Sequence, residues 1–186
     1  MKIHGQKIYL KEGLRDDNYE IFLRWFTDID VIKYLSFAKR ALKFKTTEEL
    51  ENFFAELTDA LRFEVYSNNN VLIGCIALSR FKNDECDFGI IIGEKDYWNK
   101  GIGEEVLRII LSYGFSKLNL KKISLSVSEY HNKAIHLYKK LGFKAIKIKP
   151  NARTVFHNNG WVQSGTVIME LTYPNGLSEP ISLPDK

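Results

Sequence analysis

The sequence predicts a single α/β domain with one central, mostly antiparallel sheet flanked by helices. Three observations support this fold class. The chain has 186 residues, which suits one domain. Segments with strand-like alternation are interspersed with segments of helical periodicity, in an order typical of a mixed α/β fold. Short polar turns separate three consecutive strand-like segments near the middle of the chain, which indicates an antiparallel meander.

The first third of the chain predicts one strand followed by helices. Residues 7–12, KIYLKE, alternate apolar and charged side chains and indicate a strand. Asp16 and Asp17 are expected to cap the next helix, and VIKYLSF predicts a further helical turn. A Thr46–Glu49 capping box is expected to open a helix reaching Leu61.

The middle of the chain predicts three strands and the longest helix. The strands are RFEVYS, VLIGCIAL and CDFGIII, and Gly74 inside the second of them is expected to mark a bulge. A helix rich in Leu and Ile follows Gly103. After it, KKISLSV alternates like a strand, and NKAIHLYKKLGF is amphipathic, with Gly142 ending the helix.

The end of the chain predicts the last strands and a tail. AIKIK and SGTVIMELTY are expected to close the sheet. Residues 174–186 contain three of the four prolines, so we expect an extended or disordered tail after a domain spanning residues 1–173.

Composition excludes several classes of protein. The formal net charge is +4, with basic residues scattered among acids, which disfavours a nucleic-acid-binding protein. Cys75 and Cys86 are the only cysteines and lack a CxxC pattern, so we expect buried thiols. The four histidines are scattered, and no metal site is expected. There is no signal-peptide pattern and no apolar run near the roughly 18 residues of a membrane span, so we expect a cytoplasmic protein.

A glycine-containing loop, WNKGIG, precedes the longest predicted helix. A Walker loop is excluded because no GxxxxGK[ST] string occurs, and a dinucleotide fingerprint is excluded because Val106 replaces its third glycine. Two interpretations remain. The amides at the helix N-terminus bind a pyrophosphate, helped by Lys100, or the glycines simply form a strand-to-helix turn.

The segment from Asp87 to Phe143 resembles the GNAT superfamily of N-acetyltransferases. The resemblance rests on the glycine loop, the long helix, the next strand and NKAIHLYKKLGF. This last segment is similar to the family segment N-x-x-A-x-x-L-Y-x-x-L-G-F, with one residue fewer between Asn132 and Ala134. The flanks, with IGEKDYWNKGIG and ARTVFHNNGW, look like the branch of ribosomal-protein N-terminal and spermidine acetyltransferases. The family loop usually begins with Arg or Gln, and Trp98 stands there in this sequence.

The resemblance implies a splayed sheet and direct transfer of an acetyl group from acetyl-CoA to an amine in a ternary complex. It implies that Tyr138 acts as the general acid near the sulfur and Asp87 as the base, with Glu85 as the alternative base. The other interpretations of these residues are a core tyrosine, a surface strand carboxylate and, for Asn132, a helix cap. The cofactor-binding residues it implies are Ile90, Ile91, Ile92, Trp98, Asn99, Lys100, Gly101, Ile102, Gly103, Glu104, Asn132 and Tyr138.

The sequence does not identify the amine that accepts the acetyl group. The branch resemblance places a peptide N-terminal amine of ribosomal-protein type first, with a polyamine, an aminoglycoside or a nucleotide-linked amino sugar as alternatives. Residues 15–62 and the segment NARTVFHNNGW, expected to be a loop, are predicted to form the acceptor side, with Arg153 and His157 as candidate contacts. A non-catalytic CoA-binding module is a further alternative. A homodimer is expected from the family, and neither a nucleic acid nor a membrane is expected as a partner.

Overall fold

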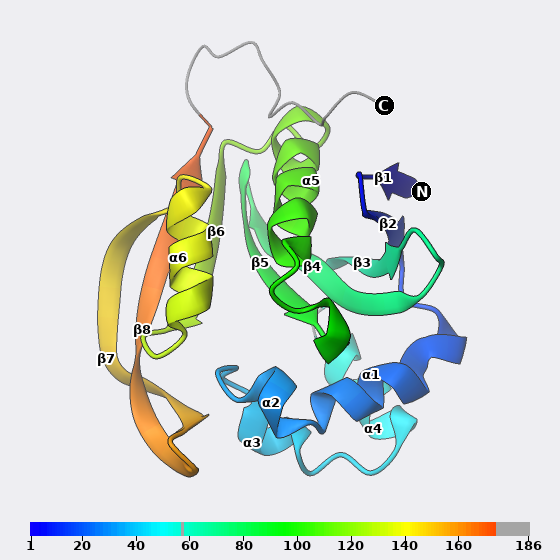
Figure 1. Cartoon of the computed structure of the whole chain (residues 1–186). Coiled ribbons are helices and arrows are strands. Elements are labelled where there is room, and N and C mark those ends of the chain that lie inside the picture. Colours follow the sequence, from blue (N-terminus) through cyan, green and yellow to red (C-terminus); the bar gives the residue numbers. More distant parts are fainter. Residues whose placement is uncertain (57, 174–186) are drawn as a thin grey trace. The chain divides into compact units, whose positions relative to one another are not determined.

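The computed structural model describes residues 1–56 and 58–173, and the predicted tail lies outside these described residues. The chain divides into two compact units. The first contains residues 1–14, 59–124 and 171–173, and the second contains residues 15–58 and 125–170. Figure 1 shows the elements of both units. The hydrogen-bonded strand order is β1-β2-β3-β4-β5-β6-β8-β7, so the predicted α/β fold with one mixed sheet is confirmed.

The first unit contains an antiparallel sheet and one long helix. Neighbouring strands from β1 to β5 pair antiparallel, and β5 pairs in parallel with the start of β6. The predicted meander is therefore present, and β1 is an additional strand that the sequence did not predict. The elements are β1 (Lys2–His4), β2 (Ile8–Glu12), β3 (Leu61–Ser67), β4 (Leu72–Lys82), β5 (Glu85–Ile92), the 3-10 helix η2 (Lys95–Tyr97), α5 (Ile102–Ser116) and the start of β6 (Lys122–Ser128).

The expected bulge near Gly74 is present. The register of β3 and β4 shifts between Val65 and Tyr66, directly beside Gly74. A Cβ atom on Gly74 would lie 2.4 Å from the carbonyl oxygen of Ile91. Only glycine therefore lets β4 approach β5 this closely.

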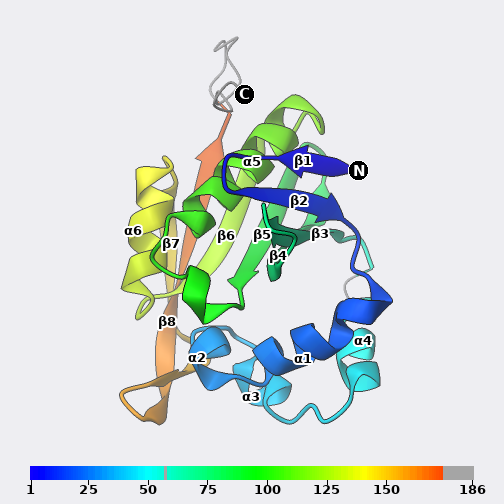
Figure 2. The same cartoon turned by 45° about the vertical axis from the view of Figure 1, so that its right-hand side comes forward.

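Helix α5 covers one face of this sheet (Figures 1 and 2). The Phe63 ring meets the Tyr113 ring of α5 edge to face, with 5.7 Å between the ring centroids. Phe63 pairs with Ile76, and Ile76 pairs with Ile90, so these side chains share the face that α5 covers. Strand alternation puts Cys86 and Phe88 on the same face and leaves Asp87 on the opposite face.

The second unit begins with helices, and the structure changes two predictions here. Asp16 and Asp17 lie inside a 3-10 helix whose N-cap is Arg15, so they do not cap α1. The Thr46–Glu49 capping box is confirmed, but its helix ends at Ala55 and Leu61 begins β3. The elements are η1 (Asp16–Asn18), α1 (Tyr19–Phe26), α2 (Ile29–Ile32), α3 (Ala38–Ala41) and α4 (Thr47–Ala55).

Aromatic side chains form much of the core between these helices. Phe26 contacts three other phenylalanine rings, with centroid separations between 5.1 and 6.3 Å. Trp25 and Phe26 are each 2% exposed. Trp25 and Phe26 therefore have a packing role.

The second unit also contains α6 (Asn132–Lys140), β7 (Lys144–His157), β8 (Gly160–Thr172) and the end of β6. Strands β7 and β8 run side by side as a long hairpin (Figure 2). Its turn is Asn158-Asn159, which have φ angles of 48° and 62°, as a tight hairpin turn requires. The segment NARTVFHNNGW, which we expected to be a loop, is thus mostly strand, because Asn tolerates the left-handed turn that lets pairing continue to the hairpin end.

Within the described residues, no helix is long and apolar enough to span a membrane.

Candidate active site

The predicted phosphate loop joins η2 to α5 in the first unit. Asn99 and Gly101 both have left-handed φ angles, 59° and 80°, and Gly101 is the N-cap of α5. The first backbone bond of the helix runs from the Glu105 amide to the Gly101 carbonyl. The amides of Ile102, Gly103 and Glu104 therefore have no acceptor within the helix, which is the arrangement that favours a bound anion.

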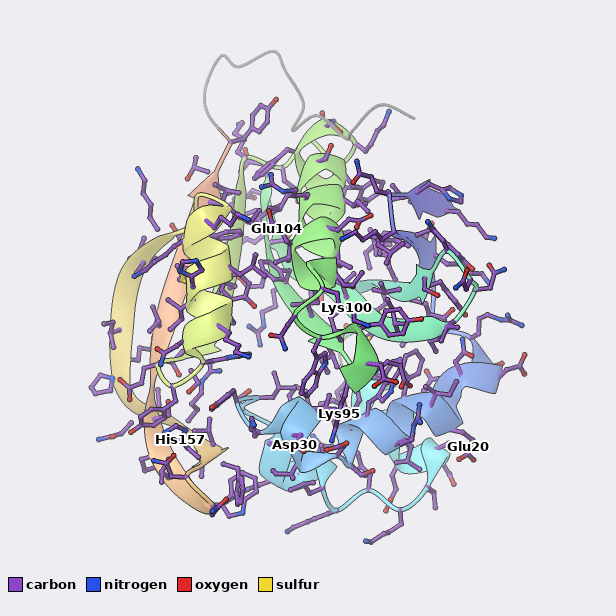
Figure 3. All side chains as sticks on the ribbon, in the orientation of Figure 1. Glu20, Asp30, Lys95, Lys100, Glu104 and His157 are labelled. Carbon is purple, nitrogen blue, oxygen red and sulfur yellow. The ribbon has the colours of Figure 1, made fainter. Side chains whose placement is uncertain are left out.

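Two carboxylates in the first turn of α5 are held by other groups. The Glu105 carboxylate accepts from the Lys7 amide at 2.8 Å. The Glu104 carboxylate accepts from Arg108 at 2.9 and 3.1 Å. Figure 3 labels Lys95, Lys100 and Glu104 around the start of this helix. Glu104 lies in the first turn of α5. Its backbone amide can donate to a phosphate, whereas its carboxylate cannot.

The loop is braced by side chains on both sides. The Trp98 indole donates to the Ile92 carbonyl at 2.7 Å, which ties the loop to the end of β5. The Lys7 ammonium donates to the Lys100 carbonyl at 3.2 Å. Trp98 therefore fixes the loop instead of supplying the side-chain phosphate contact of an Arg or Gln at that position.

Strand β5 holds the residues predicted for the pantetheine arm and for the base. Ile90, Ile91 and Ile92 pair with β4 along one edge of the strand. Pairing of β5 with β6 joins Glu85–Asp87 to Lys122–Ser124. Ile90–Ile92 lies farther along β5, toward the phosphate loop.

Both candidate bases are ion-paired. The Asp87 carboxylate accepts from Arg80 at 2.9 Å, and its side chain is 36% exposed. Glu85 pairs with Lys122 at 2.9 Å. Each candidate base therefore already has a cationic side chain as its partner.

Helix α6 in the second unit carries Tyr138 and Asn132. Tyr138 is 9% exposed, its ring lies 6.0 Å from the Phe143 ring, and burial raises the pKa of its phenol to about 12. Asn132 is the exposed first residue of the helix, and His131 is the N-cap. The alternative that Asn132 caps α6 is therefore wrong, because the helix starts one residue earlier than that role requires.

His131, the residue before Asn132, is partly buried. Burial, together with the charges of Lys33 and Lys133, lowers the pKa of its imidazole to about 4. Its amide donates to the Ser128 carbonyl at 3.0 Å, which fixes the turn between β6 and α6. Its ring lies 4.6 Å from the Tyr34 ring.

The cysteines do not suit an acyl-enzyme route. Cys75 and Cys86 are free thiols, and burial raises the pKa of each to about 12. Both therefore stay protonated and poorly nucleophilic at neutral pH. Across the described ranges, no group of His, Cys, Asp and Glu side chains could hold a metal ion.

Comparison with known proteins identifies the family. Residues 10–144 match the model of the acetyltransferase (GNAT) domain. The chain belongs to the GNAT acetyltransferase family. The predicted resemblance is therefore confirmed.

Several relatives extend this result. An uncharacterized protein of Methanocaldococcus jannaschii is 25% identical over 144 residues, covering 76% of this chain and 29% of that protein. The spermidine N(1)-acetyltransferase of Escherichia coli is 44% identical over 57 residues, covering 31% of this chain and 30% of that protein. The alignments thus span less than a third of the length of these two relatives.

Solved structures share the fold. The spermidine N-acetyltransferase of Vibrio cholerae, in complex with CoA and spermine, matches with a TM-score of 0.76 and 22% identity, covering 89% of this chain and 95% of that one. A GNAT-family acetyltransferase of Bacillus anthracis matches with a TM-score of 0.73 and 21% identity, covering 92% of this chain and 98% of that one.

Proposed function

We propose that the protein transfers the acetyl group of acetyl-CoA directly to the amine of a small molecule. The observation that carries this proposal is the left-handed turn at Gly101, which opens the N-terminus of α5 to an anion in a chain of the GNAT family. The V. cholerae relative is described in complex with CoA, which supports the same cofactor here.

The proposed cofactor contacts follow from the loop and β5. The amides of Asn99–Glu104 face the pyrophosphate, and the backbone of Ile90–Ile92 pairs with the pantetheine arm as an added strand would. Glycine at position 101 keeps the backbone accessible, and the Glu104 and Glu105 carboxylates are bound to Arg108 and to the Lys7 amide. Both carboxylates of the first turn of α5 are thus engaged by donors of the protein. Asn132 stays a proposed contact from the second unit.

The proposed chemistry forms an N–C bond and breaks the C–S bond of the thioester. Asp87 is the proposed acceptor of the amine proton. Tyr138 is the proposed donor to the leaving sulfur. Because its pKa of about 12 lies above that of a thiol, near 8.5, the phenol is better suited to donate a hydrogen bond to the developing thiolate than to transfer its proton fully.

A small amine is a better-supported acceptor than the peptide N-terminus that we placed first. Relatives named as spermidine acetyltransferases match from E. coli and from V. cholerae, the latter at 34% identity over 102 residues. Spermidine and spermine are therefore the first acceptors to test, before peptides that carry ribosomal-protein N-termini.

The proposal is tested by release of CoA thiol from acetyl-CoA, with spermidine, spermine and an N-terminal peptide supplied separately. Amine-dependent release in the wild type, reduced in both Tyr138→Phe and Asp87→Asn, is expected. Binding of CoA without release for any primary amine would support the alternative of a non-catalytic module. Parallel double-reciprocal lines would contradict direct transfer.

A further inference from the structure

Arg153 on β7 is a partly buried cation without a counter-charge. Its Nε donates to the Thr166 hydroxyl at 2.8 Å, and its Nη1 lies 3.5 Å from the Tyr34 carbonyl oxygen. Both acceptors are neutral, and within the described residues no carboxylate pairs with the guanidinium. Removing a charge from water without an opposite charge is costly, so an arginine in this position suits an anionic ligand.

The neighbourhood of Arg153 adds further positive charge. Lys33 and Lys133 both lower the pKa of His131, so their ammonium groups act on the same region. Lys33 is balanced in part by Asp30, whose carboxylate lies 3.7 Å away. Burial lowers the pKa of Arg153.

Tyr34, whose backbone carbonyl accepts from Arg153, belongs to a group of four aromatic rings in mutual contact. We call this group the ring cluster: Tyr34, Tyr130, His131 and His157. Tyr130 and His157 stack with centroids 4.4 Å apart and planes 8° from parallel. Tyr34 lies 4.6 Å from His131 and 6.2 Å from His157. Figure 3 labels His157 near the turn of the β7–β8 hairpin. Such rings offer flat faces to a sugar or a heterocycle.

The ring cluster is connected to the helix that carries Tyr138. His131 is the N-cap of α6, and Tyr138 lies within the same helix. The amide of Phe156 on β7 donates to the Lys33 carbonyl at 2.8 Å, which joins the hairpin to the segment after α2. These are the two segments in which we expected acceptor contacts.

We propose that Arg153 binds an anionic group of the acceptor, a carboxylate or a phosphate, while the ring cluster contacts the body of that molecule. The acceptor would then carry both an amine and an anion, unlike a polyamine. A guanidinium suits either group because its N–H donors match two oxygens at once. This inference rests on the proposed function, since it names the class of acceptor for the same acetyl transfer.

Matched acceptor pairs test this proposal. Glucosamine 1-phosphate is compared with glucosamine, and β-alanine with β-alaninamide, with spermidine as a third type. The anionic member of at least one pair is expected to react with the higher kcat/KM, and the preferred pair tells phosphate from carboxylate.

Substitutions at Arg153 form the second part of the test. Arg153→Gln is expected to lower kcat/KM for the preferred anionic acceptor by about 10- to 100-fold, mainly through KM. Arg153→Lys keeps the positive charge but loses the planar guanidinium. Its kcat/KM for the same acceptor is expected to lie between those of the wild type and Arg153→Gln. Lys144→Gln removes an exposed cation at the start of the same strand and is expected to leave the ratio within a pair unchanged. An equal loss for both members of a pair would mean that Arg153 only ties β7 to Tyr34.

Two results separate this inference from the proposed function. If spermidine or the neutral amines are acetylated best, the function stands and the anion site is refuted. If no amine supports thiol release, the proposed function fails, and the site is tested by titrating glucosamine 1-phosphate and β-alanine while following the ring NMR signals of His131 and His157. A saturable shift in the wild type that Arg153→Gln abolishes would support the site, and no shift with either compound would refute it.

Discussion

The buried imidazole of His131 makes the stability of the protein depend on pH. The ring lies against Tyr34, and the ammonium groups of Lys33 and Lys133 act on it. Its folded pKa of about 4 lies below the ordinary value of 6.5, so the unfolded chain binds the proton more readily. This contribution to the free energy of unfolding is therefore complete above about pH 6.5 and is lost as the pH falls toward about 4.

Replacing His131 with Gln is expected to remove this part of the pH dependence. Chemical unfolding of the wild type and the variant between pH 4 and pH 7.5 measures it, with His136→Gln, an exposed histidine on α6, as the matched control. Curves of identical slope for all three proteins would contradict the burial of a neutral imidazole.

Tyr138 gives a second prediction at the scale of one residue. Tyr138→Phe removes the proposed hydrogen bond to the leaving sulfur and is expected to lower kcat by about 100-fold while the fold is retained. Because the phenol pKa is about 12, its ionisation is not expected to lower the wild-type rate at any pH up to 10. A Phe variant of unchanged kcat would leave Tyr138 with a packing role only.

At the scale of elements, the contact between β4 and β5 depends on one glycine. Gly74→Ala would place a methyl group 2.4 Å from the Ile91 carbonyl, so the strands would have to move apart. We expect the free energy of unfolding to fall by about 1–3 kcal/mol, measured by urea denaturation. Gly89→Ala is the matched control in the neighbouring strand, because no atom lies within 4 Å of the added Cβ.

The start of α4 allows a milder test. Thr46→Ala removes the side chain that accepts from the Glu49 amide at 3.2 Å. We expect a loss of about 1 kcal/mol in the free energy of unfolding, because this backbone donor loses its cap. An unchanged urea midpoint would mean that the capping box does not stabilise the helix in solution.

Elements that are determined by residues close together in the sequence could be predicted, and elements that depend on tertiary pairing could not. The capping box at Thr46, the helix after Gly103 and the bulge beside Gly74 each depend on side chains within a few residues, and all three are present. The end of α4 and the length of the β7–β8 hairpin depend on tertiary pairing, so the periodicity misplaced them. The strand β1 is too short for an alternation pattern to reveal.

The residues of the candidate site likewise divide into those that the sequence could predict and those that only tertiary contacts reveal. The glycine loop and Tyr138 lie in a segment whose spacing resembles the family, and they could be named in advance. The role of Trp98 in tying the loop to Ile92, and the ring cluster around His131, arise from contacts between segments distant in sequence. Arg153 was named as an acceptor contact, but its lack of a counter-charge becomes visible only when its neighbours are known.

At the scale of the whole molecule, the residues proposed to bind the pyrophosphate differ from those proposed to bind the acceptor. The phosphate loop and β5 belong to the first unit, while Tyr138, Arg153 and the ring cluster belong to the second. Cofactor binding and acceptor selection can therefore be disabled by separate substitutions. Arg153→Gln is expected to leave the Kd for acetyl-CoA unchanged, which calorimetry can check alongside the acceptor assays.

The central claim is that the backbone at the start of α5 binds the pyrophosphate of acetyl-CoA. Calorimetric titration of acetyl-CoA into the wild type and into Gly103→Glu tests it most directly. Glutamate in the first turn favours a helix, so the variant is expected to fold, while its carboxylate repels the pyrophosphate. The account predicts micromolar binding in the wild type that is lost in Gly103→Glu and retained in Gly103→Ala. A folded wild type that binds no acetyl-CoA, or equal binding by all three proteins, would contradict it.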